Sequence, residues 1–352
     1  EFEKLKYPLT LGALSNGVVA STSGHSFGAS AAWGETISFK VIPDEGHVLT
    51  AVPTATGVTV NSLGMLEYSF VMPKHAVEVN AVFAGQAEAT NWALLKAMVG
   101  SVEGGTVKID GSFYTNRSIG AIVIGKPITL IAGGANRTIT REPGHTSEFF
   151  IVESGGELTL GAGAGGYGIT LDGNKYSMNA RAQLILVNSR GSLIMNSSNS
   201  VLQNNYNEDG DSPRRGGAVS IQPYGSFTLN DGQILGNEFL NSAYAHGGGV
   251  FISGNAAFIM NGGTIGYGKA FGGGGVYNDS NGSFTLNSGD ISDNHSVGGS
   301  YAEGYGGGGV YNRGAFTMNG GRILYNSANE GEKNLKLDGG VFNRNGGEIG
   351  SN

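Results

Sequence analysis

The sequence predicts an all-β protein in which a right-handed parallel β-helix (β-solenoid) with a short capping helix follows a small, separate N-terminal β-domain. Two observations predict this fold. A motif recurs at spacings of 31, 26 and 32 residues in the second half of the chain. The 352 residues also include 63 glycines against 8 prolines, without the triplet period of collagen. We expect the β-domain at 1–84, the linker and capping helix at 85–100, and the β-helix at 101–352.

Each copy of the motif reads Phe-x-x-Asn, with a valine after glycines before it and an isoleucine after it. The copies begin at Phe227, Phe258, Phe284 and Phe316. The first and third positions are apolar and the second is threonine in three of the four copies, which is the period of a strand with one buried face. One short unit cannot bury that face, whereas stacked units place Phe on Phe at a strand spacing of about 4.8 Å. Phe258 and Phe284 are therefore expected to stack in adjacent turns.

The glycine runs and the asparagines of the motif fit the corners of such a solenoid. Runs such as Gly272–Gly275 and Gly306–Gly309 permit the positive φ values of sharp corners. The asparagines fall at the same turn in every copy, where their amides can hydrogen-bond along the axis in a ladder. Because every repeat requires them, they are expected to be structural. The ladder consists of Asn230, Asn261, Asn287 and Asn319.

Degenerate copies at 193–196, 158–160 and 128–130 extend the repeat upstream, to about seven turns in all. Before them, Thr90–Val99 predicts one helix, with Thr90 or Asn91 as its N-cap and Gly100 as its stop. The helix is expected to cover the apolar first turn and its unpaired strand edges. Its apolar face consists of Trp92, Leu95 and Val99.

The N-terminal 84 residues contain fewer glycines and several strand-like runs. These runs are Leu9–Ala20, Thr36–Ile42, Val58–Asn61, Glu67–Val71 and Val77–Phe83. The segments VIPDEGHVL (41–49) and YSFVMPKHAVEVNAVF (68–83) resemble the small bacterial repeat domain related to internalin B-repeats. That module is common in bacterial surface proteins, so the resemblance implies a bacterial cell-surface or secreted protein.

The second half carries a resemblance of its own. Gly216-Gly217-Ala218-Val219 and the Phe-x-x-Asn copies are similar to the GGA[ILV] and FxxN motifs of the chlamydial polymorphic outer-membrane proteins, which are adhesins. These motifs also recur in pectin-lyase-like repeat proteins of other bacteria. The resemblance implies a pectin-lyase-like parallel β-helix and, as function, an adhesin or a structural surface protein; such motifs specify the fold better than the function.

Composition argues against several classes of partner and site. A net charge of −7 with 14% charged residues provides no basic stripe, so no nucleic-acid partner is expected. No apolar run approaches the roughly 18 residues of a membrane span, so no direct membrane insertion of this chain is expected. Cysteine is absent, and the 6 histidines lack metal-ligand spacing. We expect no cofactor, no metal and no catalytic residue.

A carbohydrate-active β-helix enzyme, either a polysaccharide lyase or a glycoside hydrolase, is the alternative. Such an enzyme needs clustered carboxylates and a nearby Lys or Arg. One candidate cluster combines Glu208, Asp209 and Asp211 with Arg214 and Arg215, and a second consists of Asp290, Asp293 and His295. Solvated surface charge explains both clusters more simply, so a binding role is favoured over catalysis.

A binding face is predicted where repeat lengths vary, between the isoleucine and the next glycine-valine corner. These segments are 236–248, 266–274, 292–308 and 325–340. In a solenoid such insertions emerge on one side, and their aromatic side chains suit a host or matrix protein or a glycan as ligand. The alternative is that they fold back and pack over the corner. The predicted residues are Phe239, Tyr244, His246, Tyr267, Phe271, His295, Tyr301, Tyr305 and Tyr325.

Overall fold

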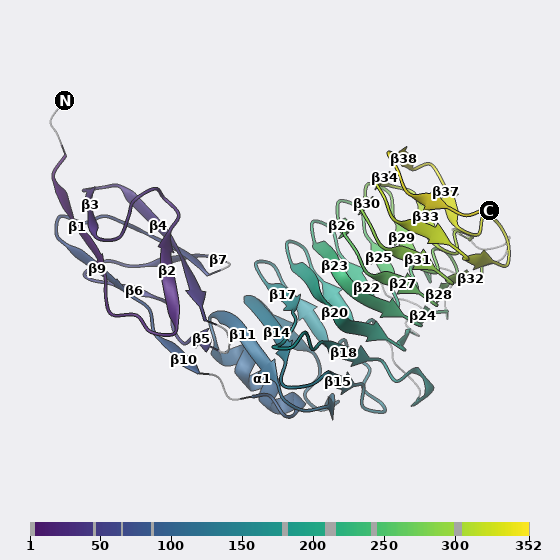
Figure 1. Cartoon of the computed structure of the whole chain (residues 1–352), viewed down its shortest axis with the longest axis horizontal. Coiled ribbons are helices and arrows are strands. Elements are labelled where there is room, and N and C mark those ends of the chain that lie inside the picture. Colours follow the sequence, from purple (N-terminus) through teal and green to yellow (C-terminus); the bar gives the residue numbers. More distant parts are fainter. Residues whose placement is uncertain are drawn as a thin grey trace.

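The computed structural model describes residues 4–44, 47–64, 66–85, 88–177, 182–207, 216–240, 245–298 and 305–351. The chain is almost entirely β, with long parallel sheets, as the sequence predicts. In Figure 1 the N-terminal strands lie at one end of a stack of strands that continues to the C-terminus. Among the described residues, the only α-helix is α1 (Trp92–Ser101), and none of their helices is long and apolar enough to span a membrane.

Each parallel sheet pairs a strand with its counterpart in the next repeat. The strands that carry the motif phenylalanines or their equivalents form the first stack. They are β11 (Gly104–Ile109), β14 (Pro127–Ala132), β17 (Glu157–Leu160), β20 (Ser192–Gln203), β23 (Ser226–Leu235), β26 (Ala257–Met260), β30 (Ser283–Leu286), β34 (Ala315–Met318) and β38 (Val341–Arg344).

The isoleucine strands form a second stack, and the long strands β20 and β23 contribute to both. Its other members are β12 (Phe113–Tyr114), β15 (Arg137–Thr140), β18 (Ile169–Asp172), β27 (Thr264–Gly266), β31 (Asp290–Ser292), β35 (Arg322–Leu324) and β39 (Glu348–Ile349). Both stacks pair in parallel, one repeat to the next, so the residues of one motif position form a column.

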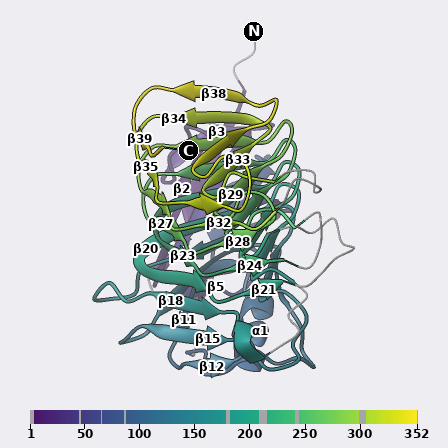
Figure 2. The ribbon, with the colours of Figure 1, turned by 90° about the vertical axis from the view of Figure 1, so that its right-hand side faces the viewer.

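The valine strands form a third parallel sheet of β13 (Ile122–Ile124), β16 (Phe150–Val152), β19 (Ile185–Val187), β22 (Val219–Ile221), β25 (Val250–Ile252), β29 (Val276–Asn278), β33 (Val310–Asn312) and β37 (Leu335–Leu337). Two-residue strands make a further narrow sheet of β21 (Tyr206–Asn207), β24 (Glu238–Phe239), β28 (Lys269–Ala270), β32 (His295–Ser296) and β36 (Ser327–Ala328). Figure 2 shows strands of successive repeats one above another.

The core of the stack is built from like residues in register. Phe258 pairs with Phe227 on one side and Phe284 on the other, at ring-centroid distances of 4.8 and 5.1 Å. These rings are almost completely buried, so the predicted stacking is confirmed. Ile265 and Ile291 pair in the same way in the second stack. Burying each such side chain stabilises the fold by roughly 1.5–3 kcal/mol.

The asparagines at the end of the motif form a continuous amide ladder. The Nδ2 of Asn261 donates to the Oδ1 of Asn230 at 2.7 Å, and the Nδ2 of Asn287 donates to the Oδ1 of Asn261 at 2.7 Å. Equivalent bonds extend the ladder to Asn196 at one end and Asn345 at the other. The amides therefore hold neighbouring repeats together at the surface.

A second, buried set of asparagines escaped the sequence analysis. The Oδ1 of Asn326 accepts from the backbone N–H of Asn294 at 2.9 Å and from its Nδ2 at 3.0 Å. The Nδ2 of Asn326 in turn donates to the carbonyl of Ile291 at 2.9 Å. These bonds satisfy backbone groups where the chain leaves the isoleucine strand and cannot use a sheet ladder.

Helix α1 lies at the end of the stack formed by the first repeats (Figure 2) and packs against β11 and β13. The Asn91 side chain caps it by accepting from the backbone N–H of Leu94 at 2.9 Å. Its buried face contains Trp92, Leu95, Met98 and Val99. The predicted stop at Gly100 is wrong, because Gly100 lies inside the last turn without a positive φ and the helix ends at Ser101.

The N-terminal strands form two four-stranded sheets around a core of their own. The first has the order β3 (Ala29–Ala32), β1 (Lys6–Leu11), β9 (Val77–Asn80), β6 (Thr54–Ala55), and the second β2 (Gly17–Ser21), β4 (Thr36–Pro43), β8 (Glu67–Val71), β7 (Asn61–Gly64). The predicted single strand at Leu9–Ala20 is instead β1 and β2, because the chain turns through Asn16 at φ 67°.

Two other N-terminal expectations are also corrected. The run Val77–Phe83 divides into β9 and β10 (Phe83–Gly85), and the run Val58–Asn61 reaches a strand only at Asn61, where β7 begins. The short strand β5 (His47–Leu49) pairs antiparallel with both β10 and β11. Backbone hydrogen bonds therefore tie the N-terminal sheets to the first strand of the parallel stack.

Candidate functional site

A column of corner residues with left-handed backbone follows the isoleucine strands. The φ value is 53° at Asn204, 61° at Gly236, 57° at Tyr267, 58° at Asp293 and 58° at Tyr325. The register of the preceding strands aligns these residues, one in each repeat. Glycine and asparagine tolerate this conformation, whereas it costs other residues about 1–2 kcal/mol.

The two tyrosines of this column are exposed as well as strained. Tyr267 is 61% exposed and Tyr325 is 79% exposed. Side chains this accessible bury little apolar surface, so packing does not offset their backbone strain. Strain that the fold does not require is found mainly at functional positions. The two tyrosines are therefore the strongest candidates for ligand contact on this side of the stack.

A surface pocket of about 190 Å³ opens beside Tyr325. In this pocket Arg322 and Asp290 form a bidentate ion pair, with Nε–Oδ1 and Nη2–Oδ2 distances of 2.7 Å each. The hydrogen bonds and charge of Asp290 raise the pKa of Arg322. Asp293 is exposed and has no hydrogen bond or ion pair within the described residues. The lining residues are Asp290, Ser292, Asp293, Arg322, Leu324 and Tyr325.

The structure does not bring together all three residues of the second carboxylate cluster considered from the sequence, Asp290, Asp293 and His295. Asp290 and Asp293 share the pocket, but His295 lies beyond the corner in β32, where its Nδ1 is 2.9 Å from the Oγ of Ser327. One carboxylate is committed to Arg322, and no titratable base faces the other across the pocket. The site thus offers aromatic surface, a hydroxyl and one available carboxylate, which suits binding rather than acid–base chemistry.

Two residues of the predicted binding face are buried, which corrects the expectation that they contact a ligand. Phe239 is 1% exposed because its side chain points inward from β24. His246 is 4% exposed and stacks on Tyr277, with ring centroids 4.2 Å apart. His246 thus packs over the outer side of the valine sheet, as the packing alternative supposed for this residue, beside a small apolar cluster of Phe251, Tyr277 and Tyr311.

The remaining predicted residues are divided between packing and solvent. Phe271 is half-buried, and Tyr305 is half-buried with the Lys336 ammonium 5.7 Å from its ring centroid. Tyr244 and Tyr301 lie outside the described residues, as does the charged segment 208–215. Among the predicted residues that the structure describes, only Tyr267 and Tyr325 therefore combine exposure with a place in one column.

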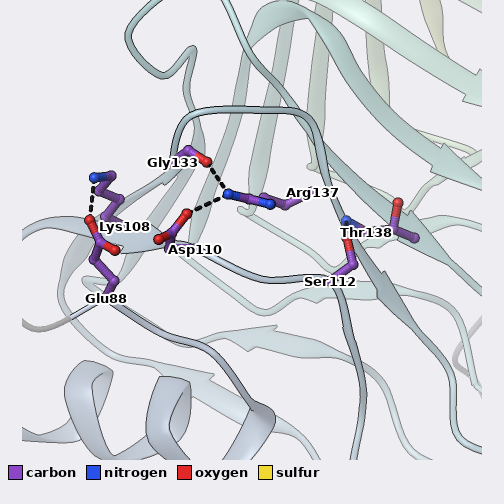
Figure 3. Close-up of polar contacts among 7 residues, drawn as sticks. All are labelled: Glu88, Lys108, Asp110, Ser112, Gly133, Arg137 and Thr138. Carbon is purple, nitrogen blue, oxygen red and sulfur yellow. Dashed lines mark hydrogen bonds and ion pairs between the residues drawn. The ribbon is translucent and has the colours of Figure 1, made fainter.

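A second charged group, which sequence reasoning missed, lies in the first repeats (Figure 3). Glu88 is ion-paired with Lys108 and Asp110 with Arg137, and the Nη2 of Arg137 also donates to the carbonyl of Gly133 at 2.5 Å. The hydrogen bond with Glu88 raises the pKa of Lys108, so this amine stays protonated and cannot act as a base at neutral pH. The available sequence signal was the spacing Lys108-x-Asp110, which places the two side chains at the end of β11 and just after it.

A buried polar network surrounds Arg141, the residue that follows β15. Burial lowers the pKa of Arg141 to about 10, and its Nη2 donates to the Oδ1 of Asn205 at 3.1 Å. Burial, followed by the charge of Arg141, lowers the pKa of His145 to about 4. The His145 Nδ1 lies 2.5 Å from the Oγ1 of Thr115. Because both side chains are inaccessible, the network serves the fold rather than a ligand.

No group of three or more metal-binding side chains close enough to hold an ion occurs among the described residues. Comparison of the chain with protein-family models, with curated proteins and with solved structures found no match in any of the three.

Proposed function

We propose that the chain is a bacterial cell-surface or secreted protein, adhesin-like in function, whose sheets close into a right-handed parallel β-helix and whose corner column binds a glycan. The parallel pairing of each repeat with the next, and the like-on-like core, support the β-helix. The resemblance to bacterial surface repeats supports the location. The column of exposed corner residues supports the binding role.

One observation carries the ligand class: two exposed, strained tyrosines flank one available carboxylate. Tyr267 and Tyr325 are two repeats apart, which corresponds to about 10 Å at the parallel strand spacing. Asp293 lies between them in the column. Tyrosine rings pack against the C–H faces of sugars, and a carboxylate accepts hydrogen bonds from their hydroxyls. An extended glycan along the column would meet all three side chains.

A carbohydrate-active enzyme is the second candidate, because Figure 3 shows two carboxylates and two basic side chains in one group. Each carboxylate there is ion-paired, and Lys108 is held in its charged form. A lyase requires an available base and a hydrolase an available acid. Binding without cleavage is therefore the proposal.

Glycan and matrix-protein arrays test the proposal with a matched pair of variants. The first is Tyr267→Asn/Tyr325→Asn, because asparagine adopts positive φ readily. The control is Tyr224→Asn, at another corner, where the tyrosine also has a positive φ of 67° and is 65% exposed. We expect the parent and control to bind the same glycans and the double variant to lose about tenfold or more in affinity. Equal binding by all three, or binding of proteins alone, would refute the glycan site.

A further inference from the structure

The pocket beside Tyr325 has a negative charge that recognition of a neutral sugar does not require. Arg322 is the basic residue that lines it, and its bidentate ion pair with Asp290 neutralises this cation. Asp293 remains exposed, without a hydrogen bond or ion pair in the described part of the chain. The net charge of the whole chain is −7, so the long-range field has the same sign.

The nearby basic groups on and beside the narrow sheet lie outside the pocket. Glu238 holds the Lys175 ammonium at 2.9 Å and the Lys269 ammonium at 3.6 Å. His295, the next residue of that column, is bonded through Nδ1 to the Ser327 hydroxyl. None of these groups lines the pocket. Among the residues that line the pocket, Asp293 is therefore the charged group without an ion-pair partner.

Aromatic rings beside a carboxylate favour a cation. The face of a tyrosine ring attracts an ammonium group, and a carboxylate forms a charge-assisted hydrogen bond with it. Tyr267 and Tyr325 lie on either side of Asp293 in the column, so one ammonium near Asp293 can meet both kinds of group. A uronic acid in the same place would bring a second negative charge to the site and be repelled.

We infer that the ligand of the corner column is a linear glycan carrying free amino groups, that is, an N-deacetylated amino-sugar polymer, whose ammonium group is held by Asp293. This inference rests on the proposed glycan-binding function and specifies its substrate class. Polymers of uronic acids are excluded from the site.

Calorimetric titration with three oligosaccharides of equal length tests the inference: a glucosamine oligomer, the matching N-acetylglucosamine oligomer and a galacturonate oligomer. The first two differ in the charged amine and its acetyl group. We expect the glucosamine oligomer to bind about tenfold or more tightly than its acetylated counterpart, and its affinity to fall as salt is raised. The galacturonate oligomer is expected not to bind.

Asp293→Asn is the matched variant, because it removes the charge at constant shape and asparagine tolerates a φ of 58°. It should bind the two amino-sugar oligomers equally, whereas Tyr267→Asn/Tyr325→Asn should weaken the binding of both. Unchanged unfolding curves establish that the variants are folded.

The outcomes separate this inference from the proposed function. Equal affinity of the parent for both amino-sugar oligomers, with loss in the tyrosine variant, would overturn the amino-group inference and leave the glycan site standing. A preference that survives in Asp293→Asn would remove Asp293 as the recognition group. Failure of the parent to bind any saccharide, here and on the arrays, would overturn both proposals.

Discussion

Phe258 and Phe284 lie face to face, with ring centroids 5.1 Å apart and planes inclined by 4°. They are directly paired residues of β26 and β30, and each is no more than 1% exposed. The same relationship continues to Phe227 on one side and to Phe316 and Phe342 on the other, so one stack of rings runs through five repeats. The core therefore depends on the register of the repeat.

Removing one ring should be costly. Phe258→Ala is expected to lower the free energy of unfolding by roughly 3–5 kcal/mol, because it leaves a cavity between two fixed neighbours. Chemical denaturation measures the change. Ser283→Ala is the control, since Ser283 is exposed on β30 and its change should stay within about 0.5 kcal/mol. A Phe258→Ala protein as stable as its parent would show that the ring stack does not support the fold.

The amide ladder should contribute less per residue. Asn261→Ala removes one donor and one acceptor and is expected to cost about 1–2 kcal/mol, because two side-chain bonds are lost at an exposed site. Asn343→Ala, on the outer side of β38, removes an exposed asparagine outside the ladder and should have little effect. If the two variants unfolded alike, the ladder would have no measurable energetic role.

The register of the core was accessible from sequence because each repeat carries Phe, Asn and Ile at fixed offsets. Element ends were harder to predict. Helix α1 continues through Gly100 because no competing turn stops it there, and Asn16 breaks a run that reads as one strand. The two-residue strand β24 has no periodicity, so nothing in the sequence indicated that Phe239 points inward.

The candidate site was predicted only in part, for a different reason. Tyr267, Asp293 and Tyr325 each follow the repeat isoleucine by two positions, where another repeat has Gly236. That alignment marks a position that demands positive φ, and its tyrosines therefore stand out. The burial of His246 could not be predicted, because it depends on its ring packing over the valine sheet.

Acidification should destabilise the protein through His145. Its pKa is lowered from 6.5 to about 4 in the folded state, so the unfolded chain binds the extra proton first. Stability is then full above pH 6.5 and falls between pH 6.5 and 4, by up to roughly 3 kcal/mol from this group. His145→Asn should reduce this slope in unfolding curves taken at several pH values. An identical slope in the variant would mean that other groups cause the acid sensitivity.

No cleavage of glycans is expected. We expect no shortening and no unsaturated ends when the protein is incubated, with and without calcium, with pectate, alginate, chondroitin or neutral polysaccharides. The reason is that the carboxylates next to basic side chains in the three described groups, Glu88, Asp110 and Asp290, are each held in an ion pair. Turnover that disappears in Asp110→Asn or Arg137→Gln would assign an enzyme site to the charged group of Figure 3. Loss in Asp211→Ala or Arg215→Ala would assign it to the 208–215 segment.

The unfolding free energy of Tyr267→Asn/Tyr325→Asn tests most directly whether these tyrosines are placed for a ligand rather than for the fold. Asparagine relieves part of the strain at φ values of 57° and 58°, and the exposed rings contribute little packing. We predict stability that is unchanged or higher by about 1 kcal/mol, measured by chemical denaturation. A loss of more than about 1 kcal/mol would show that the tyrosines hold the corner together, and would contradict the binding role.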